Sequence, residues 1–144
     1  MSKSSFIGGA VVVVFLVGSM IIVNSARLDF RARAYVAEGV NDIMPSLECL
    51  GEYFESHKAF PDSKETCELP ESKKYIATYS NGNSNGKVKI DYSFEAKAPE
   101  ASGSRDISGS LVFTPYTNTN NELNWKCLGG NLANDYRPTK CRVE

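Results

Sequence analysis

The four cysteines, Cys49, Cys67, Cys127 and Cys141, carry the clearest chemistry in this sequence of 144 residues. Thiols in such a set serve as metal ligands or form disulfides. No two of them have C-x-x-C spacing, and the single histidine, His57, has no second ligand near it in the sequence. Because they belong to a small domain behind an apolar N-terminal segment, we predict two disulfides and an oxidising location outside the cytoplasm.

The spacing of the cysteines favours local pairing. Among the three ways to pair four cysteines, Cys49–Cys67 and Cys127–Cys141 each close a short segment. The first bond would attach the end of a helix to the connection that follows it. The second would close a terminal loop of about 15 residues, which stabilises a domain by about 3 kcal/mol in the chain-entropy description.

Four basic residues lie in or beside that terminal loop: Lys126, Arg137, Lys140 and Arg142. Lysine and arginine contact phosphates in nucleic-acid complexes, so these side chains are candidates for contact with DNA or with a protein partner. An ordinary solvated basic surface is the alternative. The formal net charge of −1 does not mark the chain as a general nucleic-acid binder.

Residues that could perform catalysis do not form a recognisable set. His57 has no serine or cysteine nucleophile in a known motif, and a solvated histidine at a helix end is the simpler interpretation. The acidic residues are scattered, so no acid–base pair stands out. The stretch SNGNSNG at 80–86 lacks the lysine and the strand-to-helix context of a phosphate loop, and we interpret it as a turn. The sequence predicts no enzymatic activity, no cofactor and no metal.

The elements that position these residues begin with an apolar segment, Phe6–Val23, which contains no charged side chain. Its 18 residues would form about 27 Å of helix, enough to cross the hydrocarbon core of a bilayer. A cleaved signal peptide is the alternative, although NSA at 24–26 is a poor cleavage site. We expect a cytoplasmic tip and transmembrane helix over 1–26 and a periplasmic or extracellular domain over 27–144.

Three glycines occur within the apolar segment: Gly8, Gly9 and Gly18. Small residues let helices approach closely, so these positions are candidates for helix packing in a membrane or in a filament. Simple tolerance of glycine is the alternative. The basic residues on the two sides of the segment conflict with the positive-inside rule, so the cysteines decide the orientation.

A second helical pattern continues from the apolar segment. Apolar residues recur at spacings of three and four in one stripe: Val36, Val40, Ile43, Leu47, Leu50 and Phe54. Gly39 and Pro45 interrupt this pattern, and Pro45 is expected to kink the helix. Pro61 marks its end. The sequence thus predicts one helix over 6–56, about 75 Å long, which is apolar all round in its first half and amphipathic in its second.

Four strands are predicted after the helix. The stretch KVKIDYSFE at 87–95 alternates between polar and apolar residues, as a strand with one buried face does. The other strands are predicted at 74–79, 107–114 and 123–127, with short links rich in turn residues. Such links favour an antiparallel meander. We therefore expect an α+β fold in which one long N-terminal helix packs on a four-stranded antiparallel sheet, followed by the C-terminal disulfide loop.

Two stretches of the sequence resemble type IV pilins. DFRARAYVAEGVNDIMPSLECLGEYFESHKAFP at 29–61 is similar to the helix segment of that family, with an Ala-Arg-Ala step and a Tyr-Phe pair before a proline. WKCLGGNLANDYRPTKC at 125–141 resembles the C-terminal disulfide-bounded loop of the family. The resemblance covers nearly the whole chain. It implies a filament subunit whose N-terminal helices bundle in the filament centre while the globular domain faces outward.

The N-terminal end departs from the pattern of that family. Alignment through Arg33 places Ser4 where processed family chains begin, without a preceding glycine. The same alignment places Gly8 where the family carries a glutamate. From the missing glycine before Ser4 and the poor NSA cleavage site we expect residues 1–5 to be retained and the chain to stay anchored by Phe6–Val23.

Three functions from different classes stay open. The first is structural, as a subunit or membrane-anchored accessory component of a type IV pilus used in adhesion, motility or DNA uptake. The second is a DNA-binding module for uptake, and the third is a pilin-mimicking regulator of pilus assembly. The expected partners are other pilin subunits or pilus assembly proteins, the membrane, DNA in the second case, and further copies of this chain in a helical filament. The expected location is the bacterial inner membrane, with a periplasmic domain, or an extracellular pilus.

Overall fold

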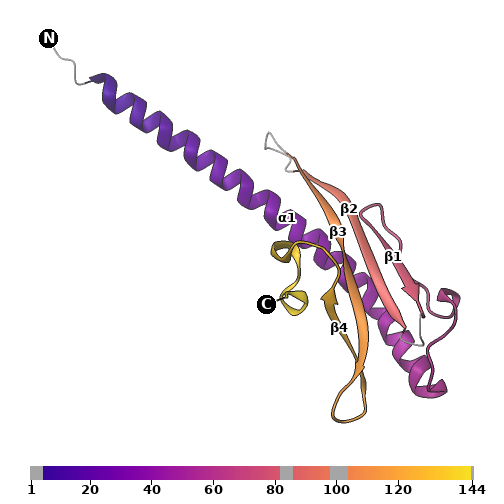
Figure 1. Ribbon diagram of the computed structural model, residues 1–144. Helices are drawn as coiled ribbons and strands as arrows, with labels where there is room; N and C mark the ends of the chain where they lie inside the picture. The colour runs from indigo at the N-terminus through magenta and orange to yellow at the C-terminus, as the bar shows by residue number, and fades with distance from the viewer. Residues whose placement is uncertain (1–4, 82–85, 98–103, 144) are drawn as a thin grey trace.

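The computed structural model describes residues 5–81, 86–97 and 104–143, with side chains from Ala26 onward. α1 spans Ser5–His57 as one uninterrupted helix of 53 residues. Its C-terminal half lies along a four-stranded sheet, and its N-terminal half extends beyond the sheet (Figure 1). The predicted single long helix is thus confirmed, and it continues through Pro45, whose side chain is exposed.

The sheet has the order β1-β2-β3-β4, and all neighbouring strands are antiparallel. The strands are β1 Tyr75–Ser80, β2 Lys87–Lys97, β3 Ser104–Thr117 and β4 Leu123–Gly129. The predicted meander is confirmed, but β3 extends beyond 107–114 at both ends. Ser104 pairs with Lys97 and Thr117 pairs with Leu123, because backbone pairing continues where apolar alternation has stopped.

The hydrophobic core lies between α1 and the inner face of the sheet. It includes these fully buried side chains: Val36, Ile43, Leu47 and Leu50 from α1, and Val88, Ile90, Tyr92, Leu111 and Phe113 from the sheet. Burial of a large apolar side chain stabilises a fold by about 1.5–3 kcal/mol. The stripe and the strand alternation predicted from the sequence therefore meet each other in the core.

Gly39 allows α1 to approach the sheet closely. A Cβ at this position would lie 2.8 Å from the Tyr92 hydroxyl oxygen and 3.1 Å from Tyr75 Cδ1. The glycine that interrupts the helical pattern in the sequence is therefore the position where two tyrosine rings pack against the helix backbone. Its lower helix propensity, about 1 kcal/mol relative to alanine, is offset by this packing.

The connection over 58–74 returns the chain from the end of α1 to the sheet. Lys58 has a φ of 56°, and its N–H donates to the Phe54 carbonyl over 2.7 Å at the helix end. The connection contains one 3-10 turn, η1 Lys64–Thr66. Ser46 on α1 donates its hydroxyl to the Glu68 carbonyl over 2.6 Å, which places the connection beside the helix.

The chain after β4 forms a terminal loop. It contains two 3-10 turns, η3 Asn134–Tyr136 and η4 Thr139–Cys141. The loop lies at the β4 edge of the sheet and beside α1, whereas the connection lies toward the β1 edge (Figure 1). The two segments therefore flank the sheet on opposite edges.

Candidate functional site

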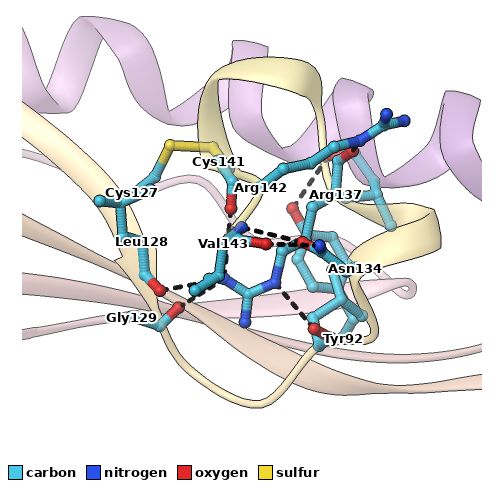
Figure 2. The surroundings of a disulfide bond; sticks show 11 residues. Tyr92, Cys127, Leu128, Gly129, Asn134, Arg137, Cys141, Arg142 and Val143 are labelled. Carbon is cyan, nitrogen blue, oxygen red and sulfur yellow. Dashed lines mark hydrogen bonds between the residues drawn. A yellow bond between two sulfur atoms is a disulfide. The ribbon is translucent and has the colours of Figure 1, made fainter.

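The terminal loop is bounded by the disulfide Cys127–Cys141 (Figure 2). The second disulfide joins Cys49 of α1 to Cys67 of the connection. The local pairing predicted from the sequence is the one in the structure, and every cysteine in the described residues is bonded. Cys127 and Cys141 are only 8% and 1% exposed, so the terminal disulfide is part of the core.

Arg137 lies at the centre of the terminal loop. Its side chain is buried, with 4% exposure, and its guanidinium donates to five backbone carbonyls. Figure 2 shows Arg137 beside three of the acceptors, Leu128, Gly129 and Cys141. The acceptors are the carbonyls of Leu132 at 2.8 Å, Leu128 at 3.1 Å, Gly129 at 3.3 Å, Cys141 at 3.3 Å and Gly130 at 2.8 Å. A guanidinium has five N–H groups in a planar fork and no acceptor, so a ring of carbonyls can satisfy it without a carboxylate. The loop is therefore folded around a buried cation.

This burial corrects the sequence interpretation of Arg137. The residue was predicted as a candidate for contact with DNA or a partner, but its donors face the interior of the loop. The other three candidates, Lys126, Lys140 and Arg142, are exposed. The Lys126 ammonium lies 4.3 Å from the centre of the Tyr116 ring. Contact of these three side chains with a ligand stays a prediction.

Two glycines allow the terminal loop to lie against β3. Gly130 has a φ of 91°, and a Cβ there would overlap the Ser110 carbonyl oxygen. Gly109 has a φ of 141°, and a Cβ there would lie 2.8 Å from Leu132 Cα. The Asn131 side-chain oxygen accepts a hydrogen bond from the Ser110 N–H over 2.8 Å. Positive φ and close approach together require glycine at both positions.

Polar contacts join the terminal loop to α1. Arg33 donates its Nε–H to the Asp135 carbonyl over 2.9 Å. On β3, Arg105 forms an ion pair with Asp29 and donates to the Tyr136 hydroxyl over 3.1 Å. The hydrogen bond with Tyr136, together with the charge of Asp29, raises the pKa of Arg105. Sequence reasoning missed this group because Asp29 and Arg105 are 76 residues apart and neither belongs to a motif.

Two buried tyrosines connect α1 to the sheet. Tyr92 donates its hydroxyl to the Val36 carbonyl over 3.0 Å, and Tyr75 donates to the Asp42 carboxylate over 2.6 Å. Burial raises the pKa of both phenols, and the hydrogen bond to Asp42 raises that of Tyr75 further. Both hydroxyls therefore stay protonated at neutral pH and act as donors to the helix.

A groove of about 970 Å³ lies between α1, the connection and β1. Its lining includes four carboxylates and one ammonium: Asp42, Glu65, Glu68, Glu71 and Lys64. Within the described residues, no group of histidine, cysteine and acidic side chains has the arrangement of a metal site. The groove is an acidic surface of the domain.

His57 ends α1 in an exposed position. Its ring stacks on Tyr53 with 4.0 Å between centroids, and its Nδ1 lies 3.0 Å from the Tyr53 carbonyl oxygen. Both contacts are local to the last helical turn. This placement fits the interpretation of His57 as a helix-terminal side chain.

The face of α1 that does not pack on the sheet forms an exposed stripe. Its members recur at spacings of three and four: Arg27, Phe30, Ala34, Ala37, Asn41, Met44, Glu48, Glu52 and Glu55. All are exposed except the half-buried Ala37. Phe30 is 73% and Met44 is 52% exposed, so the stripe presents two large apolar side chains to solvent.

No helix in the part of the chain with described side chains is long and apolar enough to cross a membrane. The predicted membrane segment Phe6–Val23 belongs to α1, but its side chains lie outside the described residues. The predicted packing positions Gly8, Gly9 and Gly18 lie in the same stretch. The anchor and the glycine packing both stay predictions.

Comparison with known protein families gives one match. The family model for pilins, which are bacterial filament proteins, matches residues 32–142. The matched region contains the sheet-packed half of α1, all four strands, both disulfides and Arg137. None of the curated proteins matches the chain.

Proposed function

The chain belongs to the pilin family, and we propose that it is a structural subunit of a type IV pilus. The family is structural rather than enzymatic, and its members assemble with other pilin subunits. The observation that carries the proposal is the shape of α1, one helix of 53 residues whose N-terminal half extends beyond the sheet. In such a helix the N-terminal half would contact other subunits, while the C-terminal half packs on the sheet.

The proposed arrangement places the two halves of α1 in different surroundings. The apolar run over 6–23 would lie first in the inner membrane and then among the helices of a filament. The sheet and the terminal loop would face outward. Their two disulfides suit an oxidising location, since disulfides persist outside the cytoplasm.

The test of this function is the composition of surface filaments. Filaments sheared from cells that produce the chain should contain it as a repeating component, identified by mass spectrometry and visible by electron microscopy. A matched preparation from cells that lack the chain serves as the control. If the chain occurs only in the membrane fraction while filaments form normally, the role of filament subunit is wrong.

A membrane-held accessory role is the second candidate. It is favoured by Gly8, an uncharged residue at the position where the resemblance to type IV pilins implies a glutamate. In this role the chain would contact pilins or assembly proteins in low copy number. Intact-mass analysis separates the two roles, because an abundant filament species that begins at Ser4 or later supports the bulk subunit. A species that retains residues 1–5 and stays mostly in membranes supports the accessory role.

A further inference from the structure

The disulfide Cys49–Cys67 can be reached from the acidic groove at one of its two sulfur atoms. Cys49 is half-buried and lines the groove, whereas Cys67 is buried, with 3% exposure. In the other disulfide, Cys127–Cys141, both cysteines are buried. Thiol–disulfide exchange requires that a thiolate reach a sulfur atom. Within the described part of the chain, Cys49 is therefore the cysteine that a thiol in solution reaches most easily.

The middle of the connection depends on this bond for its attachment to α1. Cys67 is the only buried residue over 62–68, a stretch that the structure describes in full. A hydrogen bond from the Ser46 hydroxyl to the Glu68 carbonyl, over 2.6 Å, is a second tie between the stretch and the helix. If the disulfide opened, this exposed stretch would lose the covalent bond that holds its one buried side chain in place.

The groove determines the charge and the size of what reaches Cys49. Its lining includes four carboxylates and one ammonium, so its net charge is negative. Such a field attracts cations and repels anions, and salt screens it. The volume of about 970 Å³ is at the upper end of the range for ligand sites in proteins, which leaves room for a short peptide segment.

We propose that the groove admits a cysteine thiol from a basic peptide segment to Cys49, and that exchange there releases the middle of the connection from α1. The peptide thiolate attacks Cys49 Sγ and forms a mixed disulfide, while the Cys67 sulfur leaves as a thiolate and takes up a proton. A second peptide thiolate then attacks the peptide sulfur of the mixed disulfide. Cys49 is released as a thiol, and the two peptide cysteines are oxidised to one disulfide. The reaction uses the folded domain alone, so it does not require assembly into a filament.

The terminal loop should not react with the same partner. Both of its cysteines are buried, and Arg137 holds the loop through hydrogen bonds that do not involve sulfur. Its exposed charges have the opposite sign to those of the groove, and a basic peptide is repelled by them: Lys126, Lys140 and Arg142. The proposed exchange is therefore selective for one of the two disulfides.

Three short peptides of different charge test the selectivity. Lys-Cys-Lys, Ser-Cys-Ser and Glu-Cys-Glu, with blocked termini, react with the full chain in an uncharged detergent at equal thiolate concentrations. Each rate is divided by the rate of the same peptide with a small neutral disulfide, which removes differences in nucleophilicity. At low salt the basic peptide should open Cys49–Cys67 about tenfold faster than the acidic peptide, and the ratio should fall to about twofold at about 1 M salt.

The position of the mixed disulfide tests the direction of attack. The reaction is stopped with acid, and the adduct is located by mass spectrometry of peptides prepared without reductant. The basic peptide should be attached to Cys49, because Cys67 is buried. Adducts mainly on Cys67, or a basic peptide that reacts no faster than the neutral and acidic peptides, would overturn the proposal.

Matched charge variants test the groove itself. Three groove carboxylates are neutralised in one chain by Glu65→Gln, Glu68→Gln and Glu71→Gln, which should abolish the preference for the basic peptide. The control chain loses three carboxylates that lie outside the groove lining, through Glu95→Gln, Asp106→Asn and Glu122→Gln, and should keep the preference. A preference that persists in the groove variant, or is lost equally in the control, would contradict the proposed role of the groove.

Cleavage by trypsin reports whether the connection is released. Lys64 lies in the exposed stretch, in η1, and Lys140 lies in the terminal loop. After reaction with the basic peptide, alkylation and removal of the peptide, cleavage after Lys64 should be about tenfold faster, while cleavage after Lys140 should stay slow. The variant with Cys49→Ser and Cys67→Ser should show the fast cleavage without any peptide. An unchanged rate at Lys64, or an equal increase at Lys140, would overturn selective release of the connection.

Discussion

The two disulfide-bounded segments of this chain reach order in different ways. Cys49–Cys67 and Cys127–Cys141 close segments with sequence separations of 18 and 14 residues. The terminal loop contains a buried arginine that donates to five carbonyls, and both of its cysteines are buried. The connection after α1 has exposed glutamates, and its carbonyls accept single hydrogen bonds from three separate side chains: Ser46 to Glu68, Tyr79 to Pro61 and Asn81 to Phe60.

The difference teaches that a disulfide alone does not decide how rigid a segment is. Backbone carbonyls that lack partners in a strand or helix must be satisfied when they are buried. Arg137 satisfies five of them at once, so the conformation of the terminal loop does not depend on the sulfur atoms alone. Among the described residues of the connection no single side chain satisfies several carbonyls, and the segment is held by Cys49–Cys67 together with separate hydrogen bonds from Ser46, Tyr79 and Asn81. We expect the terminal loop to be the more rigid of the two surfaces.

The largest effect is expected for Arg137→Ala. The change leaves five carbonyls, two in buried and three in part-buried hydrogen bonds, without their donor, and should lower the free energy of unfolding by about 3–5 kcal/mol. Chemical unfolding of the full chain in detergent, with and without the substitution, measures the loss. Arg142→Ala is the control, because Arg142 is exposed and its guanidinium donates to one carbonyl, that of Arg137, over 3.3 Å, so the loss should be only about 0.5–1 kcal/mol. Equal losses of unfolding free energy in the two variants would mean that Arg137 does not order the terminal loop as described.

The next effect is expected for Gly130→Ala. The added Cβ would overlap the Ser110 carbonyl oxygen at a backbone φ of 91°, so the terminal loop would have to move away from β3. A destabilisation of about 2–3 kcal/mol is expected from strain and lost hydrogen bonds. Gly51→Ala is the matched control, because Gly51 lies in a helix where an added Cβ would make an ordinary contact with Leu123 Cδ2 at 3.9 Å, and the change should stabilise the chain by about 0.5–1 kcal/mol. The same sign of change at both glycines would contradict this account.

The two disulfides should be reduced at different rates. Cys49 is half-buried and lines the acidic groove although its partner Cys67 is buried, whereas both Cys127 and Cys141 are buried, so a small thiol reagent should reach the first bond sooner, through Cys49. We expect Cys49–Cys67 to be reduced about tenfold faster, since access governs exchange when the attacking thiol is the same. Timed alkylation followed by peptide mapping gives both rates. Faster reduction of Cys127–Cys141 would mean that the terminal loop opens more readily than its buried arginine suggests.

The smallest effect concerns alkaline pH. The raised pKa values of Tyr75 and Tyr92 mean that the folded state holds these protons more tightly than the unfolded chain does. Their contribution is complete below about pH 10, the ordinary phenol value, and is lost as the pH rises through the folded-state values. Tyr92→Phe should cost about 1 kcal/mol at neutral pH and make the melting temperature fall less steeply above pH 10. If the melting temperatures of the two chains fall in parallel above pH 10, the contact of Tyr92 with α1 is not the alkaline-sensitive one.

Most of the fold can be predicted from the sequence, because it depends on periodic apolar residues. The stripe that includes Val36 and Leu47 and the alternation that includes Val88 and Ile90 are local patterns, and each is buried as predicted. The full length of β3 cannot be predicted in this way, since its outer residues are held by backbone pairing and show no apolar alternation.

The candidate site can be predicted from the sequence only in part. The cysteine spacing predicts both disulfides, but nothing in the sequence indicates that Arg137 is buried, because its acceptors are backbone carbonyls, which have no sequence signature. Gly39 interrupts the helical pattern of the sequence, and its role depends on two tyrosines that are distant in the sequence. Contacts of this kind arise only when the elements meet in space.

Electron cryomicroscopy of filaments that contain this chain tests the central claim most directly. The account predicts α1 helices that lie inside the filament, with the apolar run over 6–23 among neighbouring helices and the terminal loop on the outer surface. Filaments in which this run faces solvent, or in which the terminal loop is buried between subunits, would contradict it.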